Sequence, residues 1–225
     1  LIKSGGAGAA DGVLALTANN TYTGGTVVNQ GFLELRGTGV VLPNGGLTIN
    51  GATTNSGVIT TVTMFTNAGQ IGSGNDVTLN GKAALTLVGA NTLNSLTLNN
   101  NGGEVGPVIS PVGVLTLSSL TPVTATSNDA SVAARITGGN LALATGTNTF
   151  AIDGIKLPGS SNIYNAIAPT LTITSVIQDA TTAAAISKTG NGLLQLGGLN
   201  TYSGGTAVGA GGIILASAGT GIGAG

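Results

Sequence analysis

The chain of 225 residues contains no cysteine, no histidine and no tryptophan, and only 6% of its residues are charged. The absence of cysteine excludes disulfide bridges and thiolate metal sites. With a formal net charge of −1, the chain has no long-range field that would attract nucleic acid or an acidic membrane surface. Its six basic residues are scattered rather than clustered, so nucleic-acid binding is not expected.

Long hydrophobic runs are also missing. No stretch approaches the ~18 to 20 apolar residues that a membrane-spanning helix needs, and the N-terminus lacks the basic and apolar regions of a signal peptide. The first three residues fall inside a repeat frame, and residues 218–225 are a Gly/Ala-rich run. We therefore expect the chain to be a piece of a longer protein, with any targeting signal on the missing parts.

Glycine and aliphatic residues make up much of what is present. There are 40 glycines, and 41% of the residues are hydrophobic. Disordered chains combine low hydrophobicity with high net charge, which this chain does not. Collagen is excluded because the sequence has no Gly-X-Y period and only six prolines. We expect a folded chain that buries leucine, isoleucine and valine.

One motif, Asn-Thr-Tyr-x-Gly-Gly-Thr, occurs twice, with its tyrosines 180 positions apart (202 − 22). In both copies an apolar triplet precedes the tyrosine and another follows it, so the frame is strand, glycine-rich turn, strand. Such recurrence predicts an elongated stack of similar units in which most residues serve the stack. The motif residues are Asn20, Thr21, Tyr22, Gly24, Gly25 and Thr26 in the first copy, and Asn200, Thr201, Tyr202, Gly204, Gly205 and Thr206 in the second.

Short apolar-x-apolar triplets recur along the whole chain, separated by Asn-Gly and Gly-Gly turn signals. A period of two is typical of strands with one buried face, and no helical period is present. The sequence therefore predicts an all-β chain: one continuous right-handed parallel β-helix, or β-solenoid, over 1–225. The handedness comes from the general twist of strands. At roughly 20 to 25 residues per coil, we expect about ten coils.

Weaker copies of the motif are predicted at about 85–98 and 141–152. Leu93 and Phe150 stand there in the place of the tyrosine, although Phe150 comes one position late. Because leucine can replace the ring, we interpret the tyrosine as a packing residue and not as a catalytic group.

Two proline-containing segments, 104–126 and 153–169, interrupt the pattern. Both are predicted to bulge from the stack as loops. Loops on a rigid scaffold are common places for binding sites.

Candidate catalytic and metal-binding groups are sparse. Glycoside-cleaving and calcium-binding sites need clustered carboxylates, but the acids here are far apart in sequence, and no histidine accompanies them. The segment 72–76 resembles one unit of a calcium-binding nonapeptide repeat, but it stands alone and is interpreted as a turn. We expect no catalytic residue, no cofactor and no metal. The acidic residues are Asp11, Glu34, Asp76, Glu104, Asp129, Asp153 and Asp179.

At its two strong copies, 2–35 and 186–215, the sequence resembles the autotransporter-associated β-strand repeat. This repeat, also called the passenger-associated transport repeat, occurs in bacterial type V secretion proteins. In the first copy the segment between the lysine and the first leucine is five residues longer (14 − 3 against 194 − 188). The matching positions are Lys3, Gly5, Leu14, Leu16, Asn20 to Tyr22, Gly24 to Thr26, Val28, Gly31 and Leu33, and then Lys188, Gly190, Gly192, Leu194, Leu196, Asn200 to Tyr202, Gly204 to Thr206, Val208, Gly211 and Ile213.

The resemblance implies a passenger β-helix exported through a C-terminal outer-membrane β-barrel and displayed on the cell surface. On this basis we expect a non-catalytic structural or adhesive segment, forming a stalk or fibre. Its expected partners are a host or cell-surface ligand, or other copies of itself. Two alternatives stay open at this stage: a fragment of a carbohydrate-active β-helix enzyme, and a calcium-dependent extracellular module.

Overall fold

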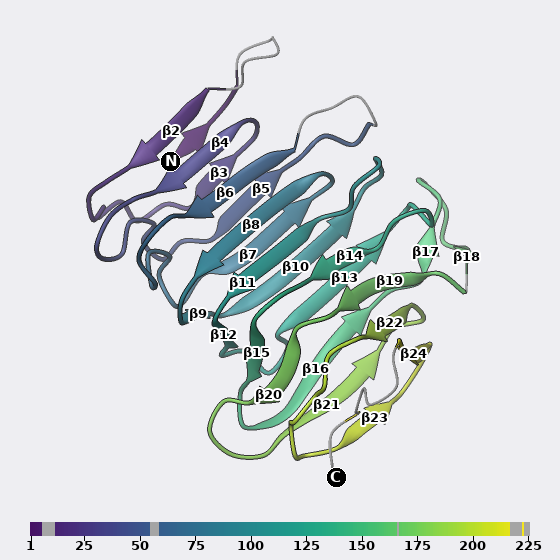
Figure 1. The fold of residues 1–225 in the computed structure, drawn as a ribbon. Helices are drawn as coiled ribbons and strands as arrows, with labels where there is room; N and C mark the ends of the chain where they lie inside the picture. Colours follow the sequence, from purple (N-terminus) through teal and green to yellow (C-terminus); the bar gives the residue numbers. More distant parts are fainter. Residues whose placement is uncertain (6–11, 55–58, 166, 217–221, 223–225) are drawn as a thin grey trace.

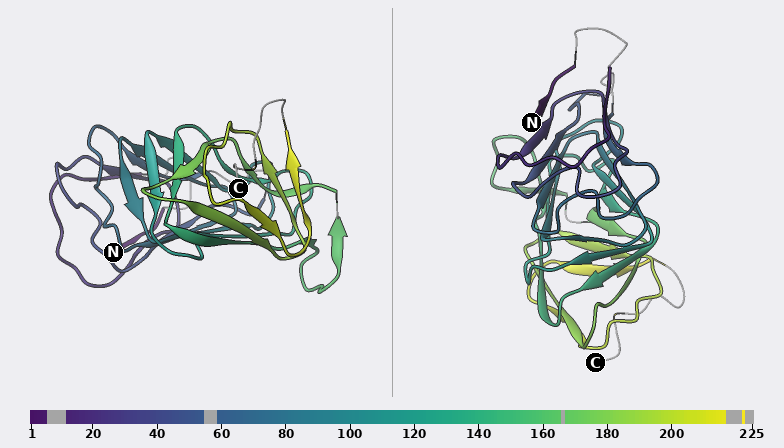
Figure 2. Two further views of the ribbon diagram at one scale, coloured as in Figure 1. Left: turned by 90° about the horizontal axis from the view of Figure 1, so that it is seen from below. Right: turned by 90° about the vertical axis from the view of Figure 1, so that its left-hand side faces the viewer.

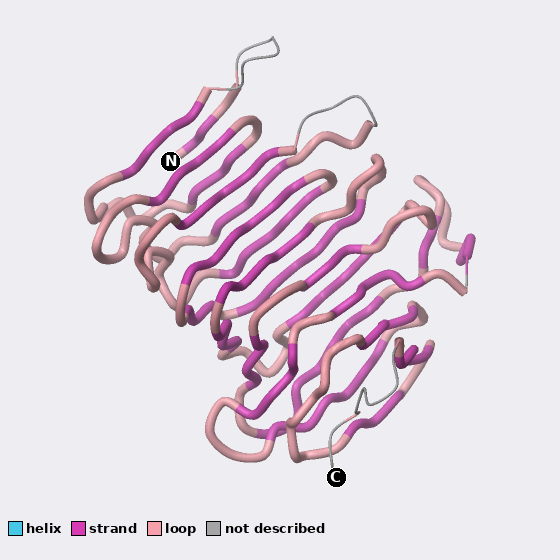
Figure 3. Tube along the Cα trace, viewed as in Figure 1, coloured by secondary structure: helices cyan, strands magenta, loops and turns pink. Residues whose placement is uncertain are grey.

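Every secondary-structure element in the described part of the chain is a β-strand, and nearly all the strands pair in parallel. The computed structural model describes residues 1–225 except 6–11, 55–58, 166, 217–221 and 223–225. Equivalent strands of successive coils stack side by side along one axis (Figure 1). No helix is present among the described residues (Figure 3). None of these residues belongs to a helix that could cross a membrane.

Two long sheets run through the chain, and we call them the first and second sheets. The first sheet contains, in spatial order, β1 (Ile2–Lys3), β3 (Thr26–Val28), β5 (Leu47–Asn50), β7 (Asp76–Asn80), β10 (Ser95–Asn100), β13 (Val123–Ser127), β16 (Gly146–Ile152), β21 (Ala184–Thr189) and β23 (Thr206–Val208). The second contains β2 (Val13–Leu16), β4 (Phe32–Leu35), β6 (Thr60–Met64), β8 (Ala83–Val88), β11 (Val108–Val112), β14 (Ala134–Ile136), β19 (Pro169–Ile173), β22 (Leu193–Leu196) and β24 (Gly212–Leu215).

Four coils in the middle of the chain add a strand at the return from the second sheet to the first. These strands form a third sheet of β9 (Asn91–Leu93), β12 (Val114–Leu117), β15 (Asn140–Leu143) and β20 (Val176–Asp179). The chain thus visits the first sheet, the second sheet and, in these coils, the third, before it returns one strand further along. The predicted parallel β-solenoid is confirmed, with nine strands in each long sheet of the described residues; its handedness stays a prediction.

The register places equivalent apolar residues directly above one another. In the first sheet Val28 pairs with Ile49, Ile49 with Leu79, and Leu79 with Leu98. All four side chains are fully buried, whereas the residues between them in each strand point outward and are half-buried. This alternation follows from the period of two that the triplets show. Burying one such side chain contributes about 1.5–3 kcal/mol to the free energy of folding. Each coil therefore adds its own buried apolar residues to the core and stabilises the stack.

Coil length varies because the turns between sheets vary. The step from Val28 to Ile49 takes 21 residues (49 − 28), and the step from Phe150 to Lys188 takes 38 (188 − 150). The longer coil contains an antiparallel hairpin, β17 (Ile155–Lys156) and β18 (Ile163–Asn165), which pairs with neither long sheet. The hairpin therefore lies outside the two long sheets, and Figure 2 shows it projecting beside them. Pro169, the last residue of the predicted loop 153–169, already belongs to β19 and pairs with Leu193 in the second sheet.

The segment 104–126 does not bulge, and that prediction was wrong. It supplies β11 to the second sheet, β12 to the third and the start of β13 to the first. Its three prolines are compatible with this strand arrangement. Two of them directly precede strands β11 and β13, and the third, Pro111, lies in β11 and pairs with Leu87 of β8. β14 pairs with β11 only at Val108 and Ile109, so the missing N–H of Pro111 falls beyond that ladder.

The segment 141–152 is not a copy of the repeat frame either. Leu141 and Leu143 lie in β15 of the third sheet, and Phe150 pairs with Lys188 in the first sheet and does not replace the tyrosine. The segment 85–98 does keep the order of the strong copies, running from β8 of the second sheet to β10 of the first. Leu-x-Leu triplets occur on all three sheets, so the triplet alone does not identify the sheet.

Candidate functional site

The two motif tyrosines lie at the same corner of their coils, where the chain passes from the second sheet to the first. The hydroxyl of Tyr202 lies 2.5 Å from Oγ1 of Thr206, and that of Tyr22 lies 2.6 Å from Oγ1 of Thr26. In each copy the Gly-Gly pair forms the turn that brings the two hydroxyls together. The spacing Tyr-x-Gly-Gly-Thr therefore encodes one hydrogen bond across a tight corner.

The ring of Tyr202 is fully buried, whereas Tyr22 is half-buried. Burial raises the pKa of Tyr202, and the hydrogen bond to Thr206 acts against that rise. A phenol that is buried, neutral and bonded to a hydroxyl packs and orients a turn. Nothing beside it would activate it as a nucleophile or base.

The other motif residues tie this corner to neighbouring coils. Asn20 donates from Nδ2 to the carbonyl of Val41 in the following coil at 2.8 Å. Asn200 accepts on Oδ1 from the amide of Ile177 in the preceding coil at 2.9 Å. The amide of Thr201 donates to the carbonyl of Ile177 at 2.8 Å, whereas the side chains of Thr21 and Thr201 are exposed.

The glycines of the second copy lie at a turn that packs against the preceding coil. A Cβ atom on Gly204 would lie 2.7 Å from the carbonyl oxygen of Ala184, and Gly205 has a φ of 80°, which side chains disfavour. Asp179 holds the same turn, accepting from the amide of Ser203 at 3.1 Å and from its hydroxyl at 2.7 Å. Burial raises the pKa of Asp179, but these bonds and one from the amide of Ala184 outweigh it, so the net pKa is lowered.

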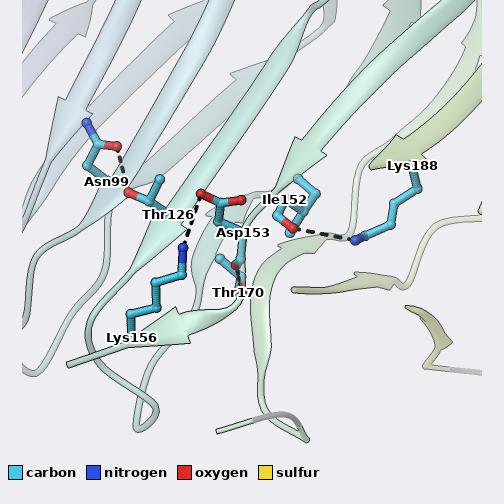
Figure 4. Close-up of polar contacts among 7 residues, drawn as sticks. All are labelled: Asn99, Thr126, Ile152, Asp153, Lys156, Thr170 and Lys188. Atoms are coloured by element: carbon cyan, nitrogen blue, oxygen red, sulfur yellow. Dashed lines mark hydrogen bonds and ion pairs between the residues drawn. The ribbon is translucent and has the colours of Figure 1, made fainter. Parts of the chain in front are cut away.

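The repeat lysines make structural contacts that the candidate-site prediction omitted, although they match the family pattern. Nζ of Lys188 is fully buried and donates to three nearby backbone carbonyls, of Thr189 at 3.0 Å, Gly190 at 2.5 Å and Ala210 at 2.9 Å. A fourth contact, to the carbonyl of Ile152 at 3.5 Å, appears in Figure 4. Burial lowers the pKa of Lys188, partly offset by the charge of Asp153.

Lys3 repeats this arrangement in the first copy. Its Nζ donates to the carbonyl of Gln30 at 2.8 Å, and Gln30 and Ala210 are 180 positions apart (210 − 30), as the two tyrosines are. The ammonium of each repeat thus bonds a carbonyl in the turn of the next coil. The signal that could have found it was the lysine shared by both copies.

A ladder of amide side chains runs along the outer edge of the first sheet. Each amide nitrogen donates to the preceding side-chain oxygen, from Asn50 to Asn29, from Asn80 to Asn50 and from Asn99 to Asn80, at 2.7–2.8 Å. Thr126 donates to Asn99 at 2.8 Å and ends the ladder (Figure 4). These bonds join five coils on the solvent side of the sheet.

Asp153 follows at the next coil, at the base of the hairpin. Its carboxylate lies 3.9 Å from Nζ of Lys156, and its carbonyl accepts from the hydroxyl of Thr170 at 2.7 Å (Figure 4). A hollow of about 250 Å³ lies beside it, lined by Asn101, Thr126, Ser127, Asn128, Asp153, Gly154, Lys156, Leu157 and Pro158.

The remaining acids lie apart and serve local structure. Glu34 pairs with Arg36 at 2.7 Å, Asp76 accepts from Asn94 and Ser95, and Asp129 accepts from the amide and hydroxyl of Ser131. Among the described residues no three His, Cys, Asp or Glu side chains come together as a metal site would require. Asp11 lies outside the described residues.

The segment 72–76 forms a turn stabilised by its asparagine. Oδ1 of Asn75 accepts from the amide of Gly46 at 2.7 Å, and Nδ2 donates to the carbonyls of Pro43 and Gly72. Both ends of the amide are used to hold neighbouring loops, as the turn interpretation requires.

Comparison with known proteins identifies the repeat. Residues 11–35 and 186–215 match the family model described as Passenger-associated-transport-repeat, which confirms the resemblance inferred from the sequence. The first match begins at residue 11, so Lys3 lies outside it, whereas the second includes Lys188. No curated protein and no solved structure matches the chain.

Proposed function

We propose that this chain, which carries two passenger-associated transport repeats, is a non-catalytic rod segment of a bacterial autotransporter passenger. In the complete protein a C-terminal barrel would hold it at the outer membrane, and the rod would act as a stalk for adhesion or self-association. The observation that carries the proposal is the stacking of nine parallel strands in each of two sheets, with a repeat at both ends of the stack.

The chemistry of the corners supports a structural role. The motif tyrosines, lysines and asparagines all bond to backbone or hydroxyl groups of their own or adjacent coils. The lysine and asparagine bonds to adjacent coils resist separation of the coils, and the tyrosine bond holds the turn within its own coil. The carboxylates discussed above likewise bond to neighbouring turns, in contrast to the paired acids of a glycosidase.

Surface display tests the proposal. An epitope inserted in the turn of the β17–β18 hairpin, between 158 and 161, would lie outside the parallel sheets and should leave the stack intact. In the native host, intact cells expressing the full-length protein should bind the antibody and lose the epitope to external protease. A cytoplasmic marker protein should stay protected. Detection of the epitope only after cell lysis would contradict the proposal.

Self-association is the second part of the proposal and has its own measurement. The net charge of −1 gives little repulsion between copies. Light scattering of the 225-residue chain over a wide range of concentration should show growth beyond the monomer mass. A constant monomer mass would remove self-association and leave adhesion to another surface.

A further inference from the structure

One basic side chain differs from the other five in having no partner among the described residues. The ammonium groups of Lys3 and Lys188 bond backbone carbonyls, Arg36 pairs with Glu34 and stacks 4.1 Å over the ring of Phe65, Lys82 lies 4.0 Å from Glu104, and Lys156 lies 3.9 Å from Asp153. Arg135 is exposed, and no ion pair or side-chain hydrogen bond joins it to the part of the chain that the structure describes. In a chain with six basic residues, an unpaired guanidinium is a distinctive feature.

Arg135 stands at the end of a row of hydrogen-bonding side chains on the outer face of the second sheet. It pairs in register with Thr172, and Thr172 pairs with Gln195 in the next coil. Thr137 and Thr174 stand in the adjacent row. Together these five residues line a hollow of about 210 Å³.

The hydrogen bonds already made inside this hollow use the hydroxyl protons of two of its threonines. The hydroxyl of Thr172 donates to Oε1 of Gln195 at 3.2 Å, and that of Thr174 donates to Oγ1 of Thr137 at 3.0 Å. This bond occupies Oε1 of Gln195 and not its amide nitrogen. The guanidinium of Arg135 and the amide of Gln195 remain as donors on either side of Thr172, two coil steps apart.

The opposite side of Arg135 differs in character. There it lines a smaller hollow of about 90 Å³ with Glu104, Val105, Gly106, Val108 and Val132. Glu104, the acid in this hollow, lies beside Lys82 and is not paired with Arg135. The arginine thus stands between an apolar wall and a row of hydroxyl and amide groups.

We propose that this face binds an acidic polysaccharide, with the guanidinium of Arg135 holding a sugar carboxylate. The planar fork of arginine matches the two oxygens of a carboxylate, and the pair gains from being charge-assisted. Thr137, Thr174 and Gln195 would bond the ring hydroxyls. Because strands in adjacent coils lie about 4.8 Å apart, a linear polymer running along the rod axis would meet Arg135, Thr172 and Gln195 on three successive coils.

The charge of the chain favours a carboxylated polymer over a densely sulfated one. A single guanidinium on a chain of net charge −1 supplies no extended positive surface, which a dense polyanion needs for tight binding. A neutral polysaccharide could form hydrogen bonds with the threonines, but it has no carboxylate to pair with the guanidinium of Arg135. The inference names the ligand class of the proposed adhesive role and rests on it.

Titration of the 225-residue chain with polygalacturonate oligosaccharides by isothermal calorimetry tests the site. The Arg135→Gln variant should bind at least about tenfold more weakly, because a charge-assisted bidentate contact is lost. Arg36→Gln is the matched control, since Arg36 is also an exposed arginine, next to β4 of the second sheet, but already has partners. It should leave the affinity unchanged. Both variants should keep the wild-type melting curve, because both side chains are exposed.

Neutral dextran and dextran sulfate separate the ligand classes. Neutral dextran should not bind, and dextran sulfate should bind more weakly than polygalacturonate. The inference would be overturned by absence of polygalacturonate binding, by equal binding to Arg135→Gln, or by equal or tighter binding of either dextran. Surface labelling of cells is independent of this titration, so failure of the site and failure of the passenger proposal are distinguishable.

Discussion

Tyr202 shows how a reactive-looking side chain serves packing. Its ring fills the corner of a coil, and its hydroxyl bonds to Thr206 across a glycine turn. Tyr22 makes the same bond to Thr26 from a half-buried position. The two copies share the bond and differ in burial, so they form a natural pair for measuring what burial contributes.

Replacing Tyr202 with phenylalanine should lower the free energy of unfolding at neutral pH by about 1 kcal/mol, because the hydrogen bond to Thr206 is lost. The variant should also change the response to alkali. Burial raises the pKa of Tyr202 above its ordinary value of 10.0, so the folded state keeps this proton longer than the unfolded state does. The contribution of the phenol is therefore complete below about pH 10 and lost as the pH rises through the folded-state pKa.

Urea titrations of wild type and Tyr202→Phe from pH 8 to 11 measure this difference. The lowered pKa of Lys188 acts in the opposite direction, adding stability as the pH rises toward 10.5, but both proteins carry it and it cancels in the comparison. The stability of the wild type should fall more steeply above pH 10. Parallel curves would contradict the assignment.

The corner between the second and first sheets is the element that the repeat specifies. It contains an asparagine bond and a Gly-Gly turn, and each contacts an adjacent coil. The lysine bridge lies at the opposite turn of the coil, where the chain passes from the first sheet to the second. Corners elsewhere use other means, such as the strands of the third sheet or the turn at Asn75. The fold therefore closes this corner with different sets of contacts in different coils, and the repeat motif is one of them.

The glycines of the two copies should respond differently to substitution. Gly204→Ala places a methyl group 2.7 Å from the carbonyl of Ala184 and should lower the free energy of unfolding by about 1–3 kcal/mol. Gly24 is the matched control, because a Cβ atom there meets nothing within 4 Å. Gly24→Ala should be neutral, or stabilising by up to about 1 kcal/mol through lower entropy of the unfolded chain.

Thermal and urea unfolding of the two alanine variants give the comparison. Equal losses in both would indicate that the motif requires glycine for backbone conformation alone. Loss only at Gly204 would show that close contact between coils is the constraint.

The whole molecule is a rod held together by apolar stacking and hydrogen bonds, with few charges. Among the described residues there are three ion pairs, and each has at least one exposed partner. Exposed pairs contribute little to stability. The side-chain ladder on the first sheet is made of neutral amides, which salt does not screen.

Raising sodium chloride from about 0.05 to about 0.5 M should therefore change the free energy of unfolding by less than about 0.5 kcal/mol. Urea, which is uncharged, is the suitable denaturant. Sodium sulfate serves as the positive control, because its exclusion from the surface stabilises proteins whatever their charge. A change above about 1 kcal/mol in sodium chloride would mean that ion pairs hold the rod together.

The sequence by itself determined the all-β class, the parallel solenoid and the repeat at both ends. It could do so because the period of two and the corner motif that occurs twice are local properties of the chain. Only the tertiary structure decided which sheet each triplet joins, since Leu14 and Leu141 belong to identical Leu-Ala-Leu triplets but lie in the second and third sheets. It also placed Phe150 opposite Lys188, kept 104–126 inside the stack, and set Arg135 beside Thr172 and Gln195. These outcomes depend on register between residues 23 to 38 positions apart (195 − 172, 188 − 150), and a local pattern does not encode the length of the turns that fix it.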